Sequence, residues 1–249
     1  MLEQKLRKLR LAHAASVIEA HHQAAIAEKL GYLEFLERVL DDELESRTGK
    51  SVQKRMRAAH FPVVKTLEEF DFAFQPKIDA KQIKSLASCD FIAKHENVLF
   101  LGPPGVGKSH LATALAVKAC LRGHSVLFST VQNFNSRCSA ALADLSIERV
   151  IGQYLDADLV VLDELGFTPL NKLVADYLFR VVSERYERGS IILTSNKSFE
   201  SWGEMFADPI LATAVLDRLI HHAHIIPIIG NSYRSKDRKP PAGDNPKDS

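Results

Sequence analysis

Eight consecutive residues carry the groups needed to bind a polyphosphate. They read Gly102-Pro103-Pro104-Gly105-Val106-Gly107-Lys108-Ser109, a complete G-x-x-x-x-G-K-[ST] pattern. Glycines let the backbone curl until several N–H groups point at one anion, and a helix that starts directly after the loop adds its positive end. We expect Lys108 to reach the β- and γ-phosphates of ATP and the Ser109 hydroxyl to ligate Mg²⁺. His110 follows and is expected to belong to the same binding loop.

The chain on either side of this loop supports the prediction. Residues 97–101 form a short apolar run typical of a strand, and residues 110–119 have a strong helical pattern. A phosphate loop requires a strand before it and a helix after it, whereas a chance glycine-rich turn does not. The context therefore favours the phosphate loop.

Two carboxylates stand at the end of a second apolar run. Residues 158–162 are predicted to form a buried central strand, and Asp163 and Glu164 follow directly. Asp163 is placed to bind Mg²⁺, directly or through water, and Glu164 could polarise the attacking water as a general base. The alternative is a strand that simply stops at charged loop residues.

Three further polar residues are candidates for the same site. Asn196 follows the apolar run 191–195, and ligands gather at the carboxyl edge of a parallel sheet, so it could hold the attacking water or merely begin a turn. Arg218 is either a surface or ion-paired residue, or an arginine finger that enters the next subunit's site. Arg234 is equally ambiguous.

Histidines cluster near the C-terminus, at positions 221, 222 and 224. No cysteine or acidic partner stands beside them in the sequence. This favours a cluster at a helix end over a metal site.

The order of the predicted elements indicates an α/β fold. Strands are predicted at 97–101, 125–129, 158–162, 190–194 and 224–228, with helices between them. Alternation of this kind implies a parallel sheet that is flanked by helices on both faces.

The parts outside the sheet have different patterns. Residues 1–60 are predicted to form a small all-helical domain, in which the leucine pattern of 33–44 ends near Gly49. Residues 61–80 look like an irregular linker whose phenylalanines we expect to pack on the domain of residues 81–234, close to the adenine pocket. A helix is predicted over 80–93, and the polar, proline-rich tail 235–249 is expected to be disordered.

A basic cluster lies near the end of the helical block. Lys50, Lys54, Arg55 and Arg57 fall within eight positions. They form either a solvated helix face or a patch that contacts the phosphates of DNA.

Overall composition excludes few functions. The formal net charge of +1 neither demands nor excludes nucleic acid as a partner. The three cysteines are far apart, without a C-x-x-C pair, which does not favour a zinc or disulfide framework. No apolar run approaches the length of a membrane span, so we expect no membrane association and a cytoplasmic location.

Taken together, the motifs resemble those of the IstB family of transposition helper ATPases, which belong to the AAA+ class and are relatives of the helicase loader DnaC. The resemblance covers nearly the whole chain. Beyond the phosphate loop it rests on residues 65–72 (KTLEEFDF), 162–167 (LDELGF), 183–190 (SERYERGS), 216–219 (LDRL) and 231–234 (NSYR).

The resemblance implies more than the spacing shows. It implies an AAA+ ATPase domain at 81–234, binding of double-stranded DNA, ATP-dependent homo-oligomers, and presentation of target DNA to the cognate transposase of an insertion element. By similarity, Asn196 matches the first sensor, Arg218 the arginine finger and Arg234 the residue that senses nucleotide in cis. An extra helical insert, here 131–150, would line the DNA path. It carries only Arg137 and Arg149 as basic residues, so the cluster at 50–57 would contribute more of the DNA affinity.

Two other functions remain open from the sequence. A helicase loader would use the same ATPase core on a protein partner. A nucleotide-gated scaffold would bind ATP with little turnover, but the presence of Asp163, Glu164 and Asn196 argues against it.

Overall fold

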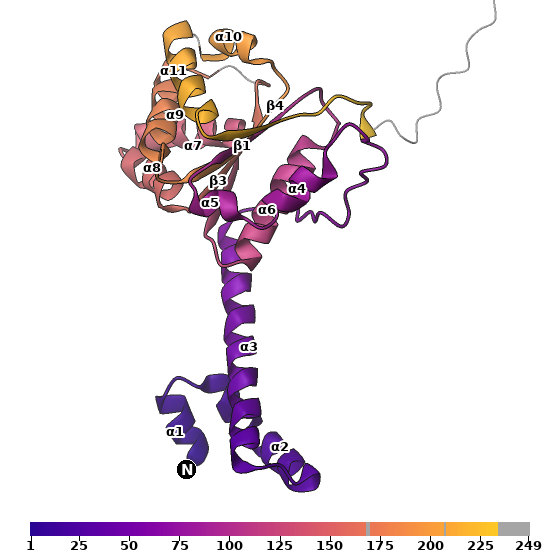
Figure 1. The fold of residues 1–249 in the computed structure, drawn as a ribbon. Coiled ribbons are helices and arrows are strands. Elements are labelled where there is room, and N and C mark those ends of the chain that lie inside the picture. The colour runs from indigo at the N-terminus through magenta and orange to yellow at the C-terminus, as the bar shows by residue number, and fades with distance from the viewer. Residues whose placement is uncertain (168–169, 207, 234–249) are drawn as a thin grey trace, which may run out of the picture. The chain divides into compact units, whose positions relative to one another are not determined.

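The computed structural model describes residues 1–167, 170–206 and 208–233, which belong to two compact units (Figure 1). The first unit is Met1–Arg55, and the second begins at Met56. The predicted tail, 235–249, lies outside the described residues. Within the described part of the chain, no helix is both long enough and apolar enough to cross a membrane.

The second unit is built on a five-stranded parallel sheet. Its strands are β1 (Asn97–Leu101), β2 (Val126–Thr130), β3 (Leu159–Leu165), β4 (Ser190–Ser195) and β5 (Ala223–Pro227). Their order in the sheet is β2-β3-β4-β1-β5, so β1 lies between β4 and β5. The predicted parallel sheet is confirmed, and the predicted strands differ from the observed ones mainly in that β3 continues to Leu165.

Helices cover both faces of this sheet because the strand side chains alternate between two cores. Leu99 and Val160 point into one core, while Val98 and Val161 point into the other. The first core is completed by α7 (Val131–Ala143), α8 (Ile147–Asp156), α9 (Lys172–Arg185), α10 (Trp202–Phe206), which follows the short 3₁₀ helix η1 (Phe199–Ser201), and α11 (Pro209–Ile220). The second is completed by α4 (Ala80–Leu86), α5 (Asp90–Ala93) and α6 (Lys108–Leu121).

The prediction of one helix over 80–93 is wrong in one respect, because the structure has two helices in this range. α4 ends at Leu86, and Cys89 takes a left-handed backbone conformation with a φ of 64°. The Ser88 hydroxyl accepts a hydrogen bond from the Asp90 N–H, which helps to start α5. A local side-chain bond of this kind competes with a continuous helix.

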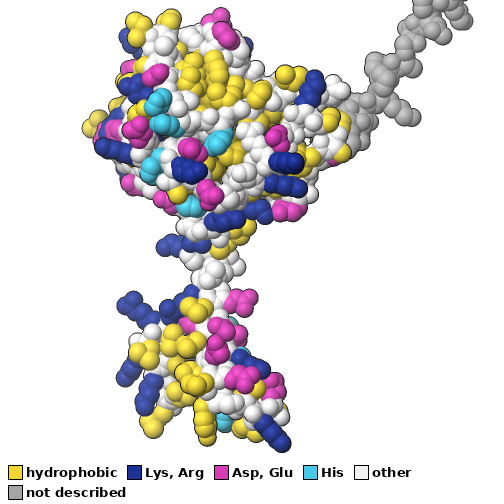
Figure 2. Space-filling view, in the orientation of Figure 1, with side chains coloured by type: hydrophobic (Ala, Val, Ile, Leu, Met, Phe, Trp, Pro, Cys, Tyr) yellow, Lys and Arg dark blue, Asp and Glu magenta, His cyan; other side chains and the backbone are white. Residues whose placement is uncertain are grey.

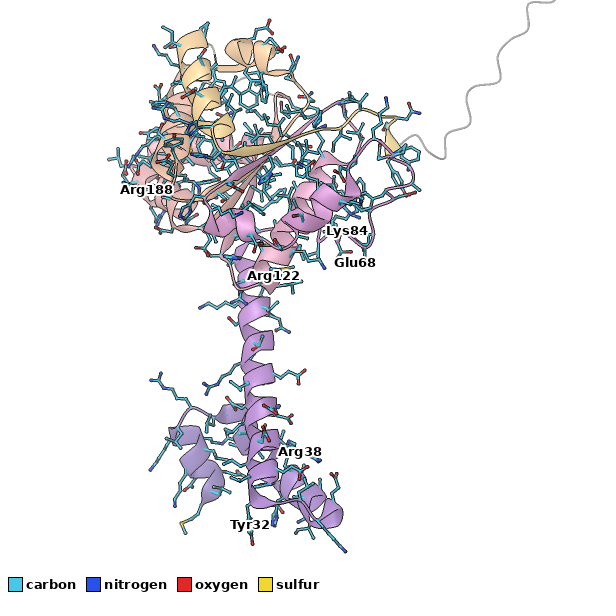
Figure 3. All side chains as sticks on the ribbon, in the orientation of Figure 1. Tyr32, Arg38, Glu68, Lys84, Arg122 and Arg188 are labelled. Atoms are coloured by element: carbon cyan, nitrogen blue, oxygen red, sulfur yellow. The ribbon has the colours of Figure 1, made fainter. Side chains whose placement is uncertain are left out.

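The first unit consists of helices, namely α1 (Leu2–Lys8), α2 (Ala12–Glu28) and most of α3 (Tyr32–Ala58), up to Arg55. Arg38 on α3 forms ion pairs with Glu28 at 2.7 Å and Glu34 at 3.6 Å (Figure 3). The predicted end near Gly49 is wrong, since α3 runs through this glycine to Ala58. A glycine inside a helix costs only about 1 kcal/mol, which its helix-forming neighbours offset.

Glu43 connects α3 to the beginning of α2. Its carboxylate is buried and accepts the backbone N–H groups of His13 at 2.9 Å and Ala14 at 2.8 Å, while Arg47 donates to its other oxygen at 2.7 Å. These N–H groups lie in the first turn of α2 and have no partner inside the helix. The hydrogen bond from Ala14, with the contacts of Arg47 and His13, lowers the pKa of Glu43.

Candidate functional site

The phosphate loop connects β1 to α6 as the sequence predicts. Gly107 is the residue before α6, so the N–H groups of the first helical turn point toward the loop. The Lys108 side chain folds back over the loop, and its Nζ donates to the carbonyls of Gly102 at 2.7 Å and Pro103 at 2.8 Å. The ammonium group is therefore held at the mouth of the loop, where an anion would meet it.

A side chain on Gly105 or Gly107 of the loop would clash with another part of the chain. Gly105 and Gly107 have φ values of 82° and 102°, in the left-handed region that favours glycine. A Cβ on Gly105 would lie 2.1 Å from the Ser232 Oγ, and one on Gly107 would lie 2.6 Å from the Phe70 ring. The loop is thus packed between two distant segments of the chain.

Asp163 lies beside the loop hydroxyl. Its Oδ1 accepts hydrogen bonds from the Ser109 Oγ at 2.8 Å and from the Thr194 Oγ1 at 2.5 Å. The carboxylate is buried. Ser109 and Asp163 together offer oxygen ligands, the kind that Mg²⁺ prefers, so the two residues predicted as metal ligands are brought together.

Glu164 is aimed by a bulge in β3. Leu162 pairs with Leu193 and Leu165 with Ser195, so Asp163 and Glu164 together oppose the single residue Thr194. Glu164 has a φ of 65° and donates its N–H to the Thr194 Oγ1 at 2.9 Å. Bulges re-aim side chains in this way. The result is a buried Asp163 next to an exposed Glu164 that faces the cleft.

A cleft of about 580 Å³ lies between the phosphate loop and Glu164. This volume is in the usual range for a small-molecule site. The residues that line it come from three places: the segment before α4 (Lys65, Glu69, Phe70, Asp71 and Gln75), the phosphate loop with His110 (Pro104–His110), and the strand ends and C-terminal segment (Glu164, Phe167, Thr194 and Tyr233).

The segment 61–79, which has no regular helix or strand, contributes part of the wall of this cleft. The His110 ring meets the Phe70 ring at 5.3 Å between centroids, and its Nε2 lies 2.8 Å from the Thr66 carbonyl. Glu68, labelled in Figure 3, pairs with Lys118 of α6 at 2.8 Å. Gln75 donates to the Asn231 carbonyl at 2.8 Å, and the Tyr233 N–H donates to Gly105 at 2.8 Å.

Asn196 follows β4 but does not line the cleft. Its side-chain oxygen is buried, has no hydrogen-bond partner among the described residues, and lies 2.6 Å from where a Cβ on Gly166 would stand. A buried polar atom without a partner is uncommon. Asn196 is thus next to the carboxylate strand, with an acceptor available for a water molecule.

Arg218 lies outside the nucleotide cleft of its own chain. It sits in the last turn of α11, where its Nη1 donates to the Ala214 carbonyl at 2.9 Å and its guanidinium lies 5.0 Å from the centre of the Phe179 ring. Arg234 lies outside the described residues.

The predicted DNA-contacting residues lie on two helices. Lys50, Lys54, Arg55 and Arg57 are on α3, and all are exposed except Arg55, which is half-buried and donates to the Ser51 Oγ at 2.7 Å. Arg137 is on α7, within the predicted insert, and its guanidinium contacts Gln153 and lies over the Tyr154 ring. The segment between β2 and β3 is helical, formed by α7 and α8.

Sequence reasoning missed Thr194, Gln75 and Tyr233 as residues of the site. Thr194 could have been predicted, because it stands at the carboxyl end of a predicted buried strand. The same argument predicted a role for Asn196. Gln75 and Tyr233 carry no local signal, because only the folded chain brings them to the phosphate loop.

The sheet order, the phosphate loop after β1 and the carboxylate pair at the end of β3 define a P-loop protein of the AAA+ class. Solved structures agree on the fold. DnaI superposes with a TM-score of 0.56 at 21% identity, over 66% of this chain and 91% of that one. AMPPCP-bound DnaA from Aquifex aeolicus gives a TM-score of 0.56 at 23% identity, over 69% of this chain and 52% of that one.

Residues 4–240 match the sequence profile described as IstB-like ATP binding protein, and the chain belongs to this family. A protein of Pseudomonas aeruginosa, named for ATP binding and for insertion sequence IS21, is 45% identical over 96% of this chain and 90% of its own length. A similarly named protein of insertion sequence IS5376, from Geobacillus stearothermophilus, is 38% identical over 93% of this chain and 92% of its own length. The chain is therefore an ATP-binding AAA+ protein of the insertion-sequence type.

Proposed function

We propose that this protein hydrolyses ATP with Mg²⁺, assembles on double-stranded DNA as a homo-oligomer, and assists the cognate transposase of its insertion element. The observation that carries the proposal is the bulge in β3, which separates a buried Asp163 bonded to Ser109 from an exposed Glu164 that faces the cleft. Binding alone needs no such exposed carboxylate, whereas hydrolysis needs a base.

The phosphate loop and the polar residues predicted around it each have a role in this proposal. The loop residues Gly102–Ser109 and His110 hold the ATP phosphates, and Lys108 moves from the loop carbonyls to the β- and γ-phosphates. Ser109 and Asp163 hold Mg²⁺, which offsets the charge that develops on the phosphates. Glu164 accepts the proton of the attacking water, and Asn196 orients that water after its side chain turns from its buried position beside Gly166 into the cleft. Arg234 is proposed to sense the nucleotide in cis.

Arg218 is proposed to act on a neighbouring subunit. In its own chain it packs on Phe179, and it is not among the described residues that line the nucleotide cleft. An arginine finger in trans has this property, because it completes another subunit's site. The proposal therefore requires a homo-oligomer.

A row of exposed leucines in the first unit supports self-association. Leu33, Leu36, Leu40 and Leu44 lie on α3, with Leu44 60% and Leu33 83% exposed. Figure 2 shows that apolar side chains gather on the surface of this unit. Contiguous exposed apolar surface is typical of interaction sites.

Double-stranded DNA is proposed to contact Lys50, Lys54, Arg55, Arg57 and Arg137. The sequence of α3 contains no Asp or Glu from residue 46 to residue 58. Phosphate neutralisation by such residues would give DNA affinity without sequence preference.

The experiment that tests the proposal measures ATP turnover and DNA binding of the purified chain with and without Mg²⁺. We expect Mg²⁺-dependent turnover and particles on double-stranded DNA that form only with ATP, visible by electron microscopy. Replacing Lys50, Lys54, Arg55 and Arg57 with Ala should reduce the salt slope of DNA binding by about one unit per lost contact. The matched control replaces the exposed lysines 77, 81, 84 and 94. No ATP turnover with DNA and transposase present would contradict the proposal.

The second candidate function is a helicase loader, favoured by the fold likeness to the DnaC helicase loader, whose structure superposes with a TM-score of 0.50 at 21% identity. The two functions differ in the protein partner. If this protein binds the transposase encoded beside its gene, the role in transposition is supported. If it binds a replicative helicase instead, the role as a helicase loader is supported.

A further inference from the structure

A group of potential metal ligands lies at the edge of the sheet opposite the nucleotide. Glu187 comes shortly before β4, and His221 and His222 come directly before β5. Each offers one ligand atom, and these atoms lie within 4.8 Å of one another. The sequence around His221 and His222 disfavours a metal site, because no acidic residue stands beside them. Glu187 stands 34 positions before His221, and the sheet brings the starts of β4 and β5 onto the two sides of β1.

The contacts within the group already resemble those of a metal centre. The Nε2 of His222 lies 3.6 Å from a Glu187 carboxylate oxygen, and the rings of His221 and His222 are 4.1 Å apart. Ligands on a tetrahedral zinc ion lie about 3.4 Å from one another, given metal–ligand distances of about 2.0–2.1 Å. All three side chains are exposed, so small rotations can bring them to that distance.

Tyr186 supplies the outer contact that metal-bound histidines usually have. Its hydroxyl lies 2.8 Å from the Nδ1 of His221 and is also hydrogen-bonded to Glu187. A partner on one ring nitrogen fixes the tautomer and leaves the other nitrogen for the ion. With Nδ1 engaged by Tyr186, Nε2 of His221 is the nitrogen that remains.

The ligand types fit a first-row transition metal better than a hard cation. Two imidazoles and one carboxylate suit Zn²⁺, and three protein ligands leave a fourth position for water. Mg²⁺ prefers oxygen ligands in octahedral geometry and is a poor match. We propose that Glu187, His221 and His222 form a Zn²⁺ site, positioned by Tyr186, that ties the end of α11 to the turn after α9.

The test is a metal titration of full-length protein without an affinity tag, after removal of metal with EDTA. Co²⁺ serves as the visible probe, and Zn²⁺ affinity is measured by competition with a coloured chelator. We expect one site per chain and a rise in melting temperature with Zn²⁺ but not with Mg²⁺.

Variants assign the site to these residues. The double variant H221A/H222A should lose the Co²⁺ spectrum and the Zn²⁺-induced stabilisation, Glu187→Gln should weaken binding at least tenfold, and Tyr186→Phe should weaken it about tenfold. The matched controls are H21A/H22A, another adjacent histidine pair, and His224→Ala, whose histidine pairs with Glu96 at 2.9 Å. Both controls should bind Zn²⁺ normally. Equal Zn²⁺ affinity in H221A/H222A and the unchanged protein would overturn the proposal, and melting curves in EDTA show that each variant is folded.

Discussion

The hydroxyl of Thr194 connects the two carboxylate residues of the site. It donates to the Asp163 Oδ1 at 2.5 Å and accepts the Glu164 N–H at 2.9 Å. One side chain from β4 therefore fixes both the orientation of the buried carboxylate and the bulged backbone that turns Glu164 toward the cleft. This places Thr194 as a positioning residue between the proposed metal ligand and the proposed base.

Thr194→Val should reduce ATP turnover about 10–100-fold and leave ATP binding nearly unchanged, since a hydrogen bond to a charged group is worth about 1.5–3 kcal/mol. Thr194→Ser keeps the hydroxyl and should restore much of the rate. The matched control is Thr213→Val, whose hydroxyl bonds only to the Pro209 carbonyl within α11. Steady-state kinetics with a nucleotide-binding assay would check this, and normal turnover in Thr194→Val would remove the residue from the mechanism.

Glu164→Gln should bind ATP normally but hydrolyse it about 10²–10⁴ times more slowly, because a positioned base typically contributes that much. The side chain is exposed at the cleft, so the fold should tolerate the change. The variant should accumulate as an ATP-bound oligomer on DNA. Single-turnover hydrolysis measures the effect, with Glu69→Gln, also on the cleft wall, as the control.

Lys108→Ala should abolish ATP binding, because the charge that offsets the β- and γ-phosphates is lost. Assembly that depends on ATP should be lost with it. Lys118→Ala, on the same helix but paired with Glu68, is the control and should bind ATP normally. A fluorescent ATP analogue gives the dissociation constants, and tight binding by Lys108→Ala would contradict the role of the phosphate loop.

Contiguous signals in the sequence predicted the strands and the phosphate loop, because each depends on neighbouring residues. A buried parallel strand needs an unbroken apolar run, and the loop needs glycines at fixed positions. The bulge at Glu164 and the roles of Gln75 and Tyr233 depend on contacts between distant segments, which no local pattern encodes. The two errors in helix ends show the same limit of local patterns. α3 continues through Gly49, and the helix predicted over 80–93 is interrupted at Cys89.

Arg185 provides a prediction about stability rather than catalysis. Its guanidinium is buried and donates to five backbone carbonyls, those of Tyr154, Leu155, Ala157, Asp158 and Ser190. Arg185→Met would remove these five hydrogen bonds, and the Asp158 carbonyl would keep the Ser190 N–H at 3.3 Å. The loss should cost about 3 kcal/mol or more and lower the melting temperature by about 6–12 °C. Arg188→Met, at an exposed position labelled in Figure 3, should have little effect. Calorimetry of both variants makes the comparison.

The arginine-finger role of Arg218 depends on its position away from its own cleft. The guanidinium packs on Phe179, so Arg218→Ala should bind ATP nearly normally. It should nevertheless hydrolyse ATP poorly, since a finger supplied in trans is worth about 10³–10⁵ in rate. The control is Arg122→Ala, an exposed arginine after α6.

Mixing two inactive variants distinguishes action in trans from action within one subunit. Arg218→Ala keeps a sound phosphate loop, and Lys108→Ala keeps a sound finger. In a mixed oligomer, some interfaces pair the intact loop of one subunit with the intact finger of its neighbour, so ATP turnover should partly return. Co-purification of differently tagged variants establishes that mixed oligomers form. If they form and turnover stays at the level of the separate variants, Arg218 acts within its own subunit or only in packing, because every other requirement of the trans mechanism would then be met.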